Sequence, residues 1–204
     1  MFGFPVREPG IPDRREGAAM TALTTVRSLI TLPVVTLGGD AVAHVRDTVF
    51  DTSARRIASF TLSGPSMLSG PLTRDLPWPA VHCLGPRAVM VRDEGALCAL
   101  SPGARRDASL GRLLGAQVVT DDGDPVGAVL DVLVEGGTSG RIVAFRLAAH
   151  RQLVHGTRHH RHQVYLPGGE ALRITGRTLV VPAHVTAYVS DGLPAFVARD
   201  GVPS

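Results

Sequence analysis

The sequence contains no lysine and no asparagine, so all 21 of its Lys and Arg positions are arginine. The absence of lysine excludes a Schiff-base cofactor site, a phosphate-binding Walker lysine and a lysine general base. The absence of asparagine excludes N-glycosylation. Aromatic residues make up only 4% of the chain, which argues against a surface on which nucleic-acid bases stack.

Cysteine and long apolar runs are also scarce. Cys83 and Cys98 are too few for the disulfide framework of a small secreted protein, and they lack the paired spacing of a zinc site. Residues 1–20 carry charges in place of the apolar core of a signal peptide. No run approaches the roughly 18 uninterrupted apolar residues that span a membrane. We therefore expect a cytoplasmic protein whose translation starts at Met1 or Met20.

Three segments of the chain recur in the same order further along the sequence. The segment VTLGGDAVAHVRD at 35–47 is matched by VTDDGDPVGAVLD at 119–131. Two later pairs of segments are also alike: RIASFTL at 56–62 with RIVAFRL at 141–147, and VHCLGPRAVMV at 81–91 with LRITGRTLVV at 172–181. A period of about 85 residues is too long for a solenoid repeat, so the pattern predicts two small domains in tandem.

Short apolar runs rich in β-branched residues alternate with Gly, Pro and Asp, which is typical of β-strands joined by tight turns. The expected strands are 32–37, 41–50, 56–62, 79–84 and 87–92 in the first repeat, and 116–120, 125–134, 141–148, 163–166, 171–175 and 178–181 in the second. Gly39 and Gly123 lie in the first hairpin turns, where glycine adopts a positive φ at low cost. Because short strands leave exposed edges unless they close, we expect each repeat to form a small barrel.

The predicted fold is all-β, with two tandem small β-barrels and a disordered N-terminal tail. The expected division is a disordered tail at 1–25, a first barrel at 26–98, a linker at 99–109, a second barrel at 110–192 and a C-terminal tail at 193–204. The Pro, Gly and charged residues of the linker are typical of a connection between domains. We refer to residues 26–98 as copy one and to residues 110–192 as copy two.

Each copy resembles the PRC-barrel domain family, which occurs in the H subunit of the photosynthetic reaction centre and in the C-terminal half of the ribosome maturation factor. The resemblance depends on an apolar strand and Gly-Asp turn, followed by a V-x-D segment at 43–50 and 127–134, R-I-x-x-F at 56–60 and 141–145, and closing segments at 76–91 and 166–181. Copy one departs from the family pattern at Ala43, where copy two has Gly127. The resemblance implies a barrel that docks onto protein, ribosomal or membrane-associated assemblies, with no cofactor and no reaction.

Asp47 and Asp131 occupy the same position in the two copies. By the two-residue period of a strand, each aspartate shares a face with apolar neighbours. An inward carboxylate must accept hydrogen bonds, so we expect each one to accept backbone N–H bonds from a neighbouring turn and to have a structural role. A catalytic acid is disfavoured, because His44 beside the first aspartate is replaced by Ala128 beside the second.

The segment HGTRHHRH at 155–162 concentrates basic side chains. Four histidines form a weak metal-site candidate: His155, His159, His160 and His162. They lack a helix to align them and a nearby Cys or acidic ligand, so a mobile basic loop is favoured. Copy one has the uncharged segment 63–73 at this place. The candidate partner-binding residues are Arg151, Arg158, His159, His160 and Arg161.

These observations predict a non-enzymatic docking or adaptor protein that binds a protein or a membrane-associated assembly, with no cofactor and no catalytic residue. Two alternatives stay open: a ribosome- or RNA-associated assembly factor, and a regulatory module beside a membrane transporter. Trp78 lies between two prolines. It either plugs a barrel end or is exposed as an anchor for a partner, and the plug is favoured.

Overall fold

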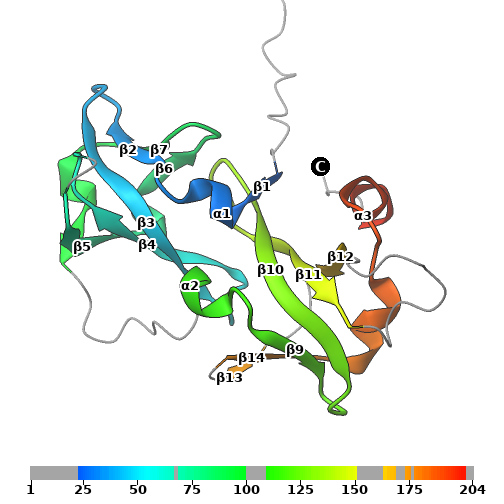
Figure 1. Cartoon of the computed structure of the whole chain (residues 1–204). Coiled ribbons are helices and arrows are strands. Elements are labelled where there is room, and N and C mark those ends of the chain that lie inside the picture. Colours follow the sequence, from blue (N-terminus) through cyan, green and yellow to red (C-terminus); the bar gives the residue numbers. More distant parts are fainter. Residues whose placement is uncertain are drawn as a thin grey trace, which may run out of the picture.

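Figure 1 shows the computed structural model, which describes residues 23–66, 69–99, 109–150, 163–168, 173–175 and 177–200. Copy one and the segment before it contain β1 (Leu23–Thr25), α1 (Val26–Leu29), β2 (Pro33–Thr36), β3 (Ala41–Asp51), β4 (Arg56–Ser63), β5 (Pro71–Pro77), the 3₁₀ helix η1 (Trp78–Ala80), β6 (Val81–Leu84), β7 (Val89–Val91), η2 (Glu94–Ala96) and β8 (Cys98–Ala99). Copy two and the segment after it contain α2 (Leu110–Leu113), β9 (Gln117–Thr120), β10 (Pro125–Glu135), β11 (Ile142–Ala149), β12 (Gln163–Pro167), β13 (Arg173–Thr175), β14 (Thr178–Val181), η4 (Ala183–Tyr188) and α3 (Leu193–Asp200).

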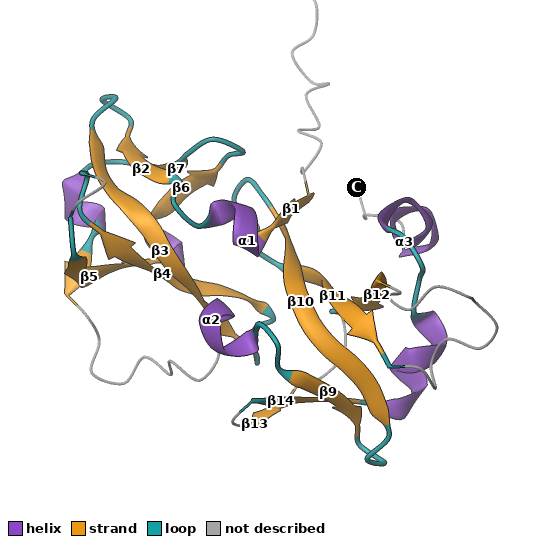
Figure 2. Ribbon diagram, in the orientation of Figure 1, coloured by secondary structure: helices purple, strands orange, loops and turns teal. Residues whose placement is uncertain are grey.

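The strands form two curled sheets with the same internal order (Figure 2). The sheet of copy one runs β6-β7-β2-β3-β4-β5-β8, and that of copy two runs β13-β14-β9-β10-β11-β12. In each sheet the first long hairpin is antiparallel, and the last strand of the repeat returns parallel to the first, as β7 beside β2 and β14 beside β9. The duplication seen in the sequence is therefore a duplication of topology.

The expectation of a mainly β fold is confirmed, and the predicted strands agree with the observed ones to within about two residues at each end. Three expectations are wrong. Residues 23–25 form β1 instead of ending a disordered tail, residues 71–77 form β5 where a loop was expected over 63–73, and residues 193–200 form α3 instead of a tail. All three elements are short or interrupted by Pro and charge, so tertiary contacts decide their structure where local periodicity gives no signal.

One apolar core runs through both copies. Ile57, Phe60 and Trp78 of copy one belong to the same buried cluster as Ile142 and Phe145 of copy two. The two sheets are therefore joined through packed side chains, and not only through the chain between β8 and α2. A continuous core of this kind makes the unfolding of one sheet depend on the other.

The copies also exchange their leading segments. β1 directly precedes copy one and α1 begins it, but β1 pairs with β10 of copy two, with Thr25 opposite Leu133. In the corresponding place, Ser109 at the start of α2 pairs with Val49 on β3 of copy one. Figure 1 shows α1 against β10 and α2 against β3. Each sheet is thus completed by a segment that belongs, by sequence, to the other copy.

An approximate two-fold axis relates the two copies at their junction. Arg56 and Arg141, which are equivalent in the repeat, form an antiparallel bridge with each other. The N–H of Ile57 donates to the carbonyl of Gly140 at 2.9 Å, and the equivalent N–H of Ile142 donates to the carbonyl of Arg55 at 2.8 Å. Pairing of equivalent positions is the mark of an isologous contact, so the chain is built like a symmetric dimer joined into one polypeptide.

Candidate functional site

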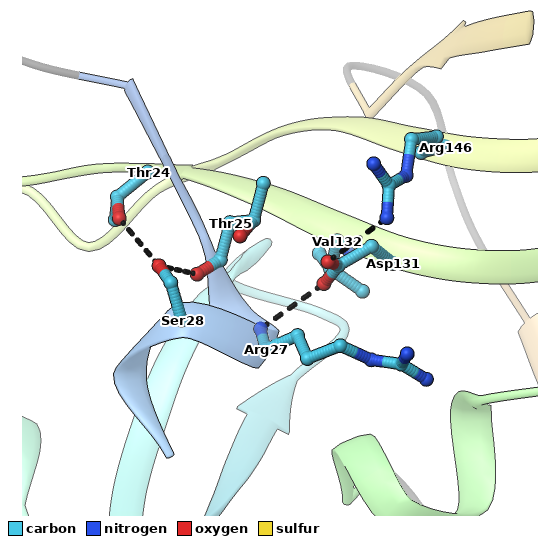
Figure 3. A network of polar contacts seen from close by, with 7 residues as sticks. All are labelled: Thr24, Thr25, Arg27, Ser28, Asp131, Val132 and Arg146. Carbon is cyan, nitrogen blue, oxygen red and sulfur yellow. Dashed lines mark hydrogen bonds and ion pairs between the residues drawn. The ribbon is translucent and has the colours of Figure 1, made fainter. Parts of the chain in front are cut away.

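Asp131 is buried beneath α1 in copy two, with 1% of its surface exposed. Its Oδ1 accepts the backbone N–H groups of Val132 at 2.9 Å and of Arg27 at 3.1 Å, as Figure 3 shows. Its Oδ2 lies 3.5 Å from the guanidinium of Arg146 on β11. The Arg27 donor comes from α1, the helix at the start of copy one, so this carboxylate fastens the exchanged segment to the second sheet.

Asp47 repeats half of this arrangement in copy one. Its Oδ1 accepts the backbone N–H groups of Thr48 at 2.8 Å and of Gly111, in α2, at 3.3 Å. The neighbouring strand supplies Thr61 opposite Asp47, whereas it supplies Arg146 opposite Asp131. Within the part of the chain that the structure describes, no ion pair involves Asp47. The carboxylate is half-buried and lines a hollow, and both of its hydrogen bonds among the described residues use Oδ1.

The hollow is a pocket of about 490 Å³ between β3, β4, β5 and α2. Its wall combines apolar side chains such as Ile30, Leu72 and Leu110 with charged residues of both signs. The charged lining residues are Arg46, Asp47, Asp75 and Arg112. A pocket of this volume and mixed character suits the insertion of a side chain from a ligand or partner.

The corresponding face of copy two is closed. There α3 places Phe196, 2% exposed, against Leu133 and Ala144, and the Phe196 ring lies 6.2 Å from the ring of Tyr165. At the equivalent positions of copy one, three different residues are found. Val49 stands in place of Leu133, Thr61 in place of Arg146 and Asp75 in place of Tyr165. All three replacements line the pocket.

The predicted turn glycines have the backbone expected of them. Gly39 has a φ of 97° and Gly123 a φ of 93°, and each is hydrogen-bonded through its N–H to the threonine carbonyl three residues earlier. Gly127 differs from its counterpart Ala43 because a Cβ at 127 would overlap the carbonyl oxygen of Ala148. Ala43 is itself fully buried. These positions shape the hairpins and lie outside the pocket.

Trp78 is 5% exposed, which excludes the exposed anchor. Its indole packs against Gly140 of copy two, where a Cβ would approach the ring to 2.5 Å, and against Phe60 at a centroid distance of 6.2 Å. It therefore seals the junction between the copies.

The histidine and arginine candidates of the basic loop lie outside the described residues: Arg151, His155, Arg158, His159, His160, Arg161 and His162. In the described ranges, no group of three His, Cys, Asp or Glu side chains is arranged to hold a metal ion. The pocket itself was missed by sequence reasoning. Its position could be found only by noticing that Thr61 and Asp75 replace the larger Arg146 and Tyr165 after alignment of β4 and β5 with β11 and β12.

Comparison of the chain with protein-family models and with curated proteins finds no match. Of the helices in the described ranges, none has the length and apolar character needed to cross a bilayer.

Proposed function

We propose that this protein is a non-enzymatic docking module that binds a protein partner through the open face of copy one. The supporting observation is the contrast between equivalent faces. On copy two this face is covered by α3 and occupied by Arg146, whereas on copy one it holds a pocket of about 490 Å³. The pocket combines apolar walls with charged residues, and protein-binding surfaces mix apolar and polar groups in this way.

The proposal includes no catalytic step. Oδ1 of Asp47 accepts hydrogen bonds from two backbone N–H groups. This suits a structural carboxylate that also presents its other oxygen to a ligand. His44, the nearest histidine in sequence, lies beside the carbonyl of Gly64 at 3.3 Å.

A PRC-barrel-like identity for each copy remains part of the proposal. It is supported by the common strand order of the two sheets and by the Gly-Asp hairpin turns at Gly39 and Gly123. A cytoplasmic location is supported by the free thiols of Cys83 and Cys98.

Affinity capture from native lysate tests the docking function when wild type is compared with Thr61→Arg. The substitution installs the residue that copy two carries at this position, so it is compatible with the fold and fills the pocket beside Asp47. Ala41→Arg is the matched control, since Ala41 is exposed near the hairpin end of β3. A protein captured by wild type and by the control, and lost with Thr61→Arg, supports the proposal. Equal capture by all three proteins contradicts it, and material lost on RNase treatment indicates RNA association instead.

A further inference from the structure

We propose that the partner of copy one presents an amphipathic helix whose aromatic side chain enters the pocket and whose arginine or lysine pairs with Asp47. This inference rests on the proposed docking function and adds the chemistry of the partner segment. The precedent lies within the chain. Copy two already receives an aromatic side chain from a helix and a guanidinium from a strand at the equivalent places.

The aromatic part of the proposal follows from α3. Phe196 is almost fully buried where it packs on Leu133 and Tyr165 of copy two. On copy one their counterparts, Val49 and Asp75, line the pocket. The smaller valine and aspartate leave the room that an incoming ring needs, since Tyr165 itself occupies space on copy two.

The cationic part follows from the two aspartates. Oδ2 of Asp131 faces the Arg146 guanidinium at 3.5 Å. On copy one, Thr61 stands opposite Asp47 and brings no charge. A cation supplied from outside would complete on copy one the pairing that copy two makes internally. A charge-assisted bond to a half-buried carboxylate is stronger than a neutral one.

The spacing of the two subsites fits a helix. Val49 and Asp47 are two residues apart on β3, which corresponds to about 7 Å along a strand. Side chains four residues apart on a helix lie on one face and are separated by about 6 Å along its axis. An aromatic and a basic residue at i and i+4, in either order, therefore reach both subsites together.

Other occupants fit less well. An extended peptide that adds to a sheet needs a free strand edge, whereas the pocket lies over β3, β4 and β5, each of which has strands on both sides. Nucleic acid would bring phosphate groups to a pocket whose charged lining is balanced, with Arg46 and Arg112 beside Asp47 and Asp75, so it would gain no net charge attraction there.

The test uses the full chain and fluorescent 16-residue helical peptides of Ala and Gln that carry one Phe and one Arg four residues apart, in both orders. Binding is followed by anisotropy, and the site is mapped by amide chemical shifts. At least one order is expected to bind saturably and to shift amides around Asp47 and Gly111. Replacing Phe by Ala in that peptide should weaken binding about 10- to 50-fold, as for a buried interface anchor. Replacing Arg by Gln should weaken it about three- to tenfold.

Two protein variants isolate the ion pair. Asp47→Asn keeps the Oδ1 acceptor for Thr48 and Gly111, so the fold is retained, but it should abolish the discrimination between Arg and Gln peptides. Asp40→Asn makes the same charge change in an exposed hairpin turn and should leave the discrimination intact. If Asp47→Asn still discriminates, or if neither peptide order shifts the pocket amides, the helix assignment is overturned.

The docking function is judged separately, by the Thr61→Arg capture experiment. If Thr61→Arg abolishes capture but no helical peptide binds, the docking function is retained and only the assignment of a helix as the partner segment is rejected. Self-association of the free chain that Thr61→Arg abolishes would overturn the helix by assigning the pocket to a second copy.

Discussion

Copy one and copy two have the same strand order and the same aspartate on their longest strand, yet they use that aspartate differently. In both copies Oδ1 accepts a hydrogen bond from a backbone N–H in the first helix of the other copy, α1 for Asp131 and α2 for Asp47. Only Asp131 is also closed in by an arginine and by α3, whereas Asp47 faces a pocket. Binding of the backbone N–H groups therefore maintains the joined fold in both copies. The second carboxylate oxygen and the adjacent strand differ between the copies, and on copy one we assign them to partner binding.

The largest effect should come from removing the better buried aspartate. Asp131→Ala leaves the Arg146 guanidinium and the N–H groups of Arg27 and Val132 without their acceptor, so we expect a loss of about 3 to 4 kcal/mol in the free energy of unfolding. Asp47→Ala should lose only about 1 kcal/mol, because its site is half-exposed and contains no ion pair among the described residues. Urea denaturation of both variants checks the contrast. Equal losses would mean that the copies do not differ in the way described.

The next effect concerns two left-handed glycines. Gly140 has a φ of 59° and its Cβ would meet the Trp78 ring, whereas a Cβ on Gly39, with a φ of 97°, would meet nothing within 4 Å. Gly140→Ala should therefore destabilise the protein by about 2 to 3 kcal/mol, through backbone strain and overpacking together. Gly39→Ala should cost about 1 kcal/mol from strain alone. A red-shifted Trp78 emission in the first variant only would place the disturbance at the junction.

The smallest effect is a dependence on pH. The hydrogen bond from Arg141 lowers the pKa of Glu135 below its ordinary value of 4.5, burial opposes this shift, and the Ser139 hydroxyl adds to it. Because the folded-state pKa is the lower one, the ionised carboxylate stabilises the fold above pH 4.5 and this contribution disappears as the pH falls through the folded-state pKa. Glu135→Gln should therefore be less stable than wild type at neutral pH, by about 0.5 to 1 kcal/mol, and equally stable in acid.

Glu94→Gln is the control for the pH experiment. Glu94 and Arg74 are 3.5 Å apart with side-chain exposures of 70% and 53%, so their pairing should contribute little at any pH. A pH-independent difference between wild type and Glu135→Gln would show that the glutamate acts by packing and not by charge.

Strand positions and the duplication could be predicted from the sequence because alternating apolar residues and Gly-Asp turns are local signals. The exchange of β1 and α1 could not, since it depends on Arg27 meeting an aspartate 104 residues away. The pocket was equally inaccessible to sequence reasoning. It arises because Thr61 and Asp75 have smaller side chains than their equivalents Arg146 and Tyr165. These equivalences can be assigned only when the register of β4 with β5 is known. Phe196 was missed because an eight-residue helix carries too few turns for a clear apolar period.

Whether the two copies unfold as one body is tested most directly by equilibrium denaturation of the intact chain, followed both by far-ultraviolet circular dichroism and by the fluorescence of its one tryptophan. Trp78 belongs to copy one, while circular dichroism reports the strands of both copies. With a shared core and exchanged helices, the two transitions should coincide in wild type, and Asp131→Ala in copy two should shift both midpoints equally. A Trp78 transition that stays at the wild-type midpoint while part of the dichroism signal moves would contradict the joined fold and leave two independent domains.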